Sequence, residues 1–147
     1  MPEHDADVAA CADAVSGLFR DLGASEVKLL DGGGKPAVWA NFPGPEGTPT
    51  VLLYAHYDVQ PTGDTDAWTS PAFEPTERDG RLYARGSADD KGGVALHVAA
   101  LRVFDGKPPV GVKVFIEGEE EVGSPSMPTL LDRYRDELAA DVYVVAD

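Results

Sequence analysis

The sequence has few cysteines, little positive charge and no long apolar run. Cys11 is the only cysteine in 147 residues, which excludes a disulfide framework and a thiolate zinc site. The 12 Lys and Arg residues are outnumbered by 26 Asp and Glu, and the net charge of −14 argues against nucleic acid or an anionic membrane as a partner. No apolar run approaches the ~20 residues of a membrane span, and the N-terminus lacks a signal sequence. We therefore expect a cytoplasmic protein.

The apolar residues predict alternating helices and strands. Helical spacing covers residues 5–22, 92–104 and 127–138, and strand-like runs cover 27–30, 37–42, 50–55, 81–84, 110–116 and 141–146. Residues 57–80 form a long connection, a type of segment that usually has a function. His97 lies among apolar residues of a helix, where we expect a core histidine. The pattern predicts an α/β fold with a mostly parallel mixed sheet flanked by helices.

Six side chains that can bind a metal ion or move a proton follow strand-like runs or the glycine-rich turns after them. They are His56, Asp58, Asp89, Glu120, Glu121 and Asp147. In an open α/β sheet, ligands bind in the crevice beyond the carboxyl ends of the strands. One sheet edge can therefore gather all six, which is typical of a dinuclear metal hydrolase.

Each local segment also has an ordinary structural explanation. His56 and Asp58 could be a core histidine and a turn residue, and residues 119–121 a solvated acidic turn. Asp89 could open a helix, where the helix dipole favours negative charge. The functional interpretation differs: a metal-binding histidine donates its other ring N–H to a carboxylate or carbonyl. One carboxylate can bridge two cations, and one of two adjacent glutamates can ligate while its neighbour is a general base.

Three segments carry a resemblance to a known family. Residues 54–61 read Tyr-Ala-His-Tyr-Asp-Val-Gln-Pro, residues 87–92 read Ser-Ala-Asp-Asp-Lys-Gly, and residues 117–124 read Glu-Gly-Glu-Glu-Glu-Val-Gly-Ser. Over residues 50–147 the chain resembles the dinuclear zinc peptidase family of carnosinase, cytosolic non-specific dipeptidase, carboxypeptidase G and the aminoacylases. It looks most like the carnosinase and dipeptidase branch.

The resemblance implies a zinc-exopeptidase-like catalytic domain and a set of metal ligands. His56 and Asp147 would bind the first metal, Asp89 would bridge both metals, and Glu121 would bind the second. An Asp at position 147, rather than a Glu, resembles the dipeptidase branch. Two Zn²⁺ ions fit this histidine and carboxylate set, and Mn²⁺ or Co²⁺ could also bind.

The resemblance also implies catalytic roles. Asp58 would orient the catalytic site, Glu120 would be the general base, and the Asp89–Asp90 peptide bond would be cis. The expected activity is metal-dependent hydrolysis of dipeptides or small peptides. Two alternatives remain open: an N-acyl-amino-acid deacylase or carboxypeptidase of the same family, and a metal-binding fragment without catalytic activity.

Members of the family are much longer than this chain. They continue for several hundred residues, with a lid and dimerisation domain and a second ligand histidine. We therefore expect residues 1–147 to be the N-terminal portion of the catalytic domain, without the lid and without the rest of that domain. Such a fragment would be inactive alone, and the full-length protein could form a homodimer.

Overall fold

The computed structural model describes residues 4–147 as a layered α/β structure. The helices are α1 (Asp5–Asp21), α2 (Lys91–Val103), α3 (Met127–Arg133) and α4 (Arg135–Leu138), with short 3₁₀ turns η2 (Thr65–Ala67) and η3 (Glu120–Val122). The strands are β1 (Glu26–Leu30), β2 (Ala37–Phe42), β3 (Thr50–His56), β4 (Thr76–Arg78), β5 (Arg81–Tyr83), β6 (Gly111–Glu117) and β7 (Val142–Val145).

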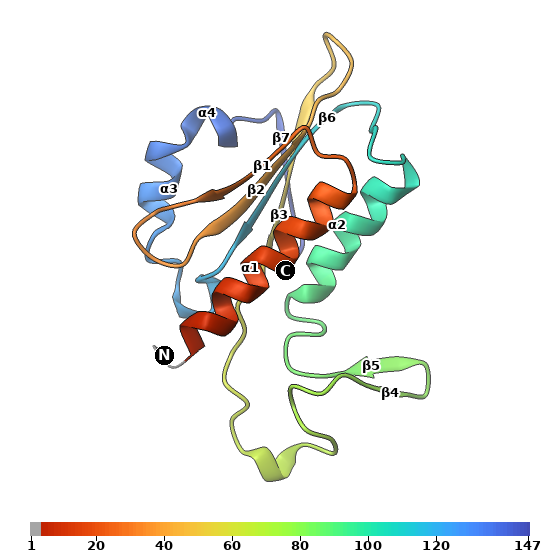
Figure 1. Ribbon diagram of the computed structural model, residues 1–147, viewed down its shortest axis with the longest axis vertical. Helices are drawn as coiled ribbons and strands as arrows, with labels where there is room; N and C mark the ends of the chain where they lie inside the picture. Colours follow the sequence, from red (N-terminus) through yellow and green to blue (C-terminus); the bar gives the residue numbers. More distant parts are fainter. Residues whose placement is uncertain (1–3) are drawn as a thin grey trace.

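Five strands form one mixed sheet in the order β1-β2-β6-β3-β7 (Figure 1). β3 runs parallel to both β6 and β7, in the half of the chain where strands and helices alternate. β2 runs antiparallel to β1, because the chain reverses directly between them, and it also runs antiparallel to β6. The predicted α/β fold with a mixed sheet and flanking helices is confirmed.

Helices cover both faces of the sheet, as Figure 1 shows. On one face, Phe19 of α1 and Val98 of α2 pack in a core with Ile116 of β6. On the other face, Leu130 of α3 packs in a second core with Trp39 of β2. Because β2 and β6 are covered on both faces, nearly every residue in them is buried. None of the helices in the described part of the chain has both the length and the apolar character needed to cross a bilayer.

The three parallel strands bring their carboxyl ends to one edge of the sheet. β3 lies between β6 and β7; His56 pairs with Glu117 of β6, and Tyr54 pairs with Val145 of β7. Residues that directly follow these strands are therefore neighbours in space, although they lie up to 90 positions apart in the sequence. This is the edge where ligands of open α/β sheets bind.

The long connection after β3 contains more regular structure than the sequence predicted. It includes η2, and its last part, β4, pairs with β5 in a separate hairpin that projects from the molecule (Figure 1). Asp79 and Gly80 form the turn, with φ of 51° and 71°. Positive φ at both central residues is typical of a type I′ hairpin, for which Asp-Gly is a favoured sequence. The Asp-Gly pair is the signal that could have located β4.

The helix expected over residues 127–138 is interrupted. Tyr134 has φ −115° and ψ 35°, which separates α3 from α4. Its hydroxyl accepts a hydrogen bond from the backbone N–H of Asp31, at 3.1 Å, in the loop after β1. The prediction of one continuous helix was therefore wrong. The break at Tyr134 coincides with a contact to a distant segment, which the spacing of apolar residues does not reveal.

Candidate metal centre

His56 is the buried centre of the candidate site. It ends β3, its side chain is fully buried, and its Nδ1 lies 3.1 Å from the backbone carbonyl oxygen of Asp58. That contact favours a proton on Nδ1, which leaves a lone pair on Nε2. Within the described part of the chain, Nε2 is buried without a hydrogen-bond partner. A carboxylate oxygen of Asp89 lies 3.1 Å away but not in hydrogen-bond geometry, so a cation at Nε2 would satisfy this lone pair.

Carboxylates from three other segments surround this ring nitrogen. Nε2 lies 3.1 Å from Asp89, 3.7 Å from Asp147 and 3.8 Å from Glu120. Ligand atoms of His56, Asp89 and Asp147 lie within 4.8 Å of one another. Tetrahedral zinc, with bonds of ~2.0–2.2 Å, needs ligand atoms about 3.3–3.6 Å apart, and the distances to Asp89 and Asp147 bracket this range.

The donor set fits a divalent metal ion, since several carboxylates face one imidazole and leave an excess of negative charge. The structure brings His56, Asp89 and Asp147 together, as predicted. His56 and Asp147 lie at or after the ends of parallel strands of the main sheet, whereas Asp89 directly precedes the N-cap of α2. Their role as metal ligands stays a prediction. Glu121 is not a member of this group in the structure.

Asp58 connects the end of β3 to the turn after β6. Its two carboxylate oxygens accept hydrogen bonds from the backbone N–H groups of Glu120 and Glu121, at 3.2 and 3.1 Å. Oδ1 of the same carboxylate lies 3.3 Å from Nδ1 of His56. Asp58 therefore contacts the histidine through its carbonyl and its carboxylate, and also fixes the backbone of the acidic turn.

The Asp89–Asp90 peptide bond is cis, as the family resemblance implied. The two side chains face different groups. Asp89 lies beside Nε2 of His56, whereas the buried Asp90 carboxylate accepts the N–H of His56 and the N–H of Gly93, both at 3.0 Å. Asp90 thus caps α2 and attaches it to β3. Its position directly before an expected helix start is the signal that could have identified this cap.

The three consecutive glutamates after β6 have three different environments. Glu119 accepts the backbone N–H groups of Lys35 and Ser126, at 3.0 and 3.3 Å. Glu121 accepts hydrogen bonds from Gln60, at 2.7 Å and 3.2 Å. Glu120 lies closest to the buried ring of His56. The like charges are therefore held apart by donors from different parts of the chain.

Electrostatics at the site favour protonation of both His56 and Glu120. Burial lowers the pKa of His56, but the nearby carboxylates of Asp58, Asp90 and Glu120 outweigh it and raise the pKa above its ordinary value. Desolvation raises the pKa of Glu120, His56 opposes that shift, and the charge of Asp147 adds to it. These directions describe a carboxylate-rich site without a cation. A bound divalent ion would oppose both shifts.

Tyr54 of β3 and Glu117 of β6 lie near His56 in the sheet, and neither was among the predicted site residues. The Tyr54 hydroxyl donates to the buried Glu117 carboxylate at 2.6 Å, between neighbouring strands β3 and β6. Burial and this hydrogen bond raise the pKa of Tyr54. His97 is also close, with Nε2 2.8 Å from the Tyr54 carbonyl oxygen, and it is buried in α2. The prediction that His97 is a core histidine is confirmed.

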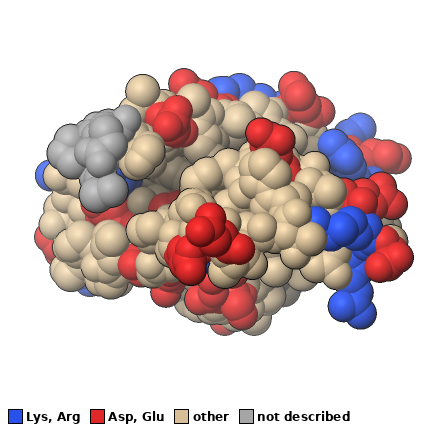
Figure 2. Space-filling model, turned by 90° about the horizontal axis from the view of Figure 1, so that it is seen from below, with Lys and Arg blue, Asp and Glu red and all other residues tan. Residues whose placement is uncertain are grey.

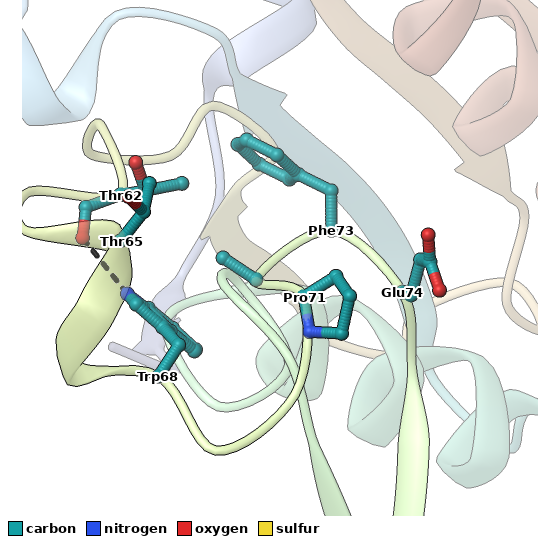
Figure 3. Close-up of a pocket in the computed structure, with 7 residues that line it drawn as sticks. Thr62, Thr65, Trp68, Pro71, Phe73 and Glu74 are labelled. Atoms are coloured by element: carbon teal, nitrogen blue, oxygen red, sulfur yellow. Dashed lines mark hydrogen bonds between the residues drawn. The ribbon is translucent and has the colours of Figure 1, made fainter.

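The connection after Asp58 surrounds a mostly apolar hollow of about 310 Å³ (Figure 3). Trp68 lines it, and its indole N–H donates to the carbonyl oxygen of Thr62 at 2.9 Å. Phe73 also lines it and is 64% exposed. Arg85 lies 5.4 Å from the centre of the Trp68 ring, within the range of a cation–π interaction.

Acidic side chains are scattered over the end toward which β3 runs. Figure 2 views this end, and Asp and Glu are spread over the face, whereas most visible Lys and Arg gather at one side. The surface agrees with the net charge of −14. Such a surface attracts cations and disfavours polyanions.

The chain matches a peptidase family, and dipeptidases are among the known proteins with similar sequences. Residues 52–146 match the model of peptidase family M20/M25/M40. A cysteinylglycine-S-conjugate dipeptidase of Corynebacterium striatum is 44% identical over 102 residues, which cover 67% of this chain and 22% of that protein. The human beta-Ala-His dipeptidase is 39% identical over 103 residues, or 67% of this chain and 20% of the relative. This chain thus spans about a quarter or less of these relatives.

Solved structures agree with the sequence match. Human carnosine dipeptidase 1 has a TM-score of 0.87 at 31% identity, covering 100% of this chain and 34% of that protein. The M20 family metallo-carboxypeptidase Sso-CP2 of Sulfolobus solfataricus has a TM-score of 0.84 at 29% identity, covering 92% of this chain and 31% of that one. The resemblance drawn from the sequence motifs is confirmed, and the chain belongs to peptidase family M20/M25/M40.

Proposed function

We propose that this chain supplies the N-terminal part of the catalytic domain of a metal-dependent dipeptidase. The observation that carries the proposal is the buried Nε2 of His56, which lacks a hydrogen-bond partner in the described structure and is faced by Asp89 and Asp147. The names of the relatives support dipeptides as the substrate class. The cytoplasmic location stays a prediction from the sequence.

In this proposal, His56, Asp89 and Asp147 would hold the first metal ion. Asp89 would also contribute to the site of the second, together with Glu121. Zinc suits this mixture of imidazole and carboxylate, and Mn²⁺ or Co²⁺ are further candidates. When bound, the metal ions polarise the peptide carbonyl and acidify the attacking water.

Glu120 is the proposed general base. Its Oε2 lies 3.8 Å from His56, at the centre of the site, whereas donors elsewhere in the chain hold the carboxylates of Glu119 and Glu121. Glu120 takes a proton from the attacking water at this carboxylate and passes it to the leaving amine. Asp58 keeps the Glu120 backbone in place and holds the His56 ring.

The rest of the active site is assigned to parts of the protein outside residues 1–147. Two observations support this assignment: the chain spans 34% of human carnosine dipeptidase 1, and the second metal has only Asp89 and Glu121 among the proposed ligands. Catalytic zinc sites usually have three protein ligands. A further ligand, a lid over the substrate and a homodimer interface would come from the remaining protein.

A deacylase or carboxypeptidase is the second candidate within the same family. A succinyl-diaminopimelate desuccinylase of Bradyrhizobium is 46% identical over 82 residues, and the Sulfolobus structure is named as a carboxypeptidase. The proposed metal centre serves all these reactions, because each is hydrolysis of an amide bond. The groups that recognise the two ends of the substrate would distinguish them.

A chimera tests the proposal. The segment at residues 50–147 would replace the matching segment of the Corynebacterium dipeptidase, and hydrolysis of dipeptides and N-acyl amino acids would be measured with added Zn²⁺ or Mn²⁺. We expect a metallated chimera that hydrolyses dipeptides and loses metal when His56→Ala is introduced. A folded chimera that binds metal but hydrolyses neither substrate class would contradict the proposed chemistry.

A further inference from the structure

Gln60 holds the carboxylate of Glu121 from across the site. It lies in the connection just after β3, 61 positions from Glu121 in the sequence. Its side-chain amide donates to Oε2 of Glu121 at 2.7 Å and to the Glu121 carbonyl oxygen at 3.1 Å. Its backbone N–H donates to Oε1 at 3.2 Å. One residue therefore contacts both oxygens of this carboxylate.

These contacts fix the orientation of the Glu121 carboxylate but leave some of its lone pairs free to bind a cation. A carboxylate has about four lone-pair sites, so two donors leave about two for another ligand. Rotation about the last side-chain bond would break both hydrogen bonds. Asp58 fixes the backbone of the same residue, since its carboxylate accepts the Glu121 N–H at 3.1 Å. Glu121 is thus held at its backbone and at its carboxylate by neighbouring residues of one loop.

We propose that Gln60 is a positioning residue that orients Glu121 to bind the second divalent cation. The inference rests on the proposed function, which assigns Glu121 to that cation. Ligating carboxylates are generally hydrogen-bonded by outer partners, and loss of such a partner typically lowers metal affinity about 10–100-fold. In its contacts with Glu121, Gln60 acts as a donor and is uncharged, so it leaves the negative charge of the carboxylate to be neutralised by the cation.

The exposure of Gln60 distinguishes a positioning role from a purely structural role. Gln60 is exposed, and its hydrogen bonds to Glu121 lie at the surface, where such bonds contribute little to folding. Removing the amide should therefore leave the melting temperature almost unchanged. A positioning role instead requires a large change in the binding of the second cation and none in the first.

The test uses Gln60→Met, which keeps the length of the side chain and the backbone N–H but removes the amide donor. Thr62→Val is the matched control in the same loop. The parent chain and each variant would be placed within the chimera described above, whose host supplies the remaining ligands of the second cation. Each protein would be loaded with one equivalent of Zn²⁺ and titrated with Mn²⁺, while NMR follows paramagnetic broadening of the backbone amides of residues 60 and 121. Broadening at these positions reports local binding and ignores Mn²⁺ on other surface carboxylates.

We expect Gln60→Met to raise the Mn²⁺ concentration for half-maximal broadening about 10–100-fold, with Zn²⁺ affinity unchanged and Thr62→Val behaving as the parent chain. Equal or tighter Mn²⁺ binding in Gln60→Met would overturn the inference, as would the absence of broadening near Glu121 in the parent chain. Failure of the parent chain to bind the first Zn²⁺ would count against the proposed function instead.

Discussion

Like charges that are adjacent in the sequence are separated in space after β6. Three consecutive acidic residues suggest that metal ions or a shared proton must offset their repulsion. The structure supplies other donors for two of them: backbone N–H groups of Lys35 and Ser126 for Glu119, and Gln60 for Glu121. This leaves Glu120 beside His56 as the carboxylate with the freedom to move a proton.

Substitution of Glu120 tests the assignment of Glu120 as the general base and Glu121 as a metal ligand. In the chimera, Glu120→Gln should keep metal but lose about 10²–10⁴-fold in turnover, because the amide cannot accept the proton. Glu121→Gln should instead lose the second metal. Metal content and turnover would be measured on both variants. Metal loss in Glu120→Gln with retention in Glu121→Gln would mean that the two roles are reversed.

Gly34 makes room for the Glu119 carboxylate. A β-carbon at this position would overlap Oε1 of Glu119 and Oγ of Ser126. We therefore expect Gly34→Ala to displace Glu119 from its two N–H donors and to destabilise the fold by about 1–3 kcal/mol. Urea unfolding of the 147-residue chain measures the effect. Unchanged stability would show that Glu119 finds equivalent donors elsewhere.

At the scale of single residues, the sequence predicted the groups at strand ends but not their supporting contacts. His56 and Asp147 could be grouped because parallel strands end at one edge, whereas Asp89 reaches the same site from the turn before α2. Gln60 and Glu117 could not, because their partners depend on strand register and on the path of a loop. Local patterns carry no information about contacts such as Gln60 to Glu121, 61 positions apart.

Among the secondary-structure elements, those with strong apolar patterns were predicted best. β2 was predicted with the bounds that it has, and α1 and α2 within one residue at each end. Each helix buries one face, which gives a helical period, and β2 is buried on both faces and reads as a mostly apolar run. The break at Tyr134 and the short strand β4 were missed. Both depend on pairings with other segments, Asp31 in one case and β5 in the other.

A substitution of Gly17 tests the packing of helix α1 and is also a control for the Gly34→Ala variant. A β-carbon at Gly17 would meet no atom within 4 Å other than the helix's own backbone and its chain neighbours. Because glycine in a helix interior costs roughly 0.5–1 kcal/mol relative to alanine, Gly17→Ala should stabilise the chain by about that amount. Urea unfolding under the same conditions measures it. A loss of stability would indicate that α1 packs more tightly than described.

For the whole molecule, β7 is the least covered part of the main sheet. Val142, Tyr143, Val144 and Val145 are apolar but 42–64% exposed, although such a pattern is typical of a parallel strand covered on both faces. β7 is the last strand in the sheet order, so its outer backbone groups have no strand partner among the described residues. Exposed apolar edges favour association with further polypeptide, which agrees with the proposed partial domain.

The isolated 147-residue chain should not hydrolyse dipeptides. The proposed second metal has two protein ligands here, and the groups that would position the substrate lie in other parts of the protein. Dipeptide hydrolysis with excess Zn²⁺ or Mn²⁺ would be compared with the chimera. Turnover within about tenfold of the chimera, abolished by His56→Ala, would show that residues 1–147 contain a complete active site.

The most direct test of the account is the first metal ion itself. Calorimetric titration of the purified chain with Zn²⁺ should give one specific equivalent that His56→Ala and Asp147→Asn abolish or strongly weaken. His4→Ala is the matched control, because His4 is 61% exposed and lies outside the candidate ligand group. We predict that this control binds Zn²⁺ like the parent chain. Unchanged Zn²⁺ binding in folded His56→Ala would contradict the account, because the buried ring nitrogen would then not be a metal ligand.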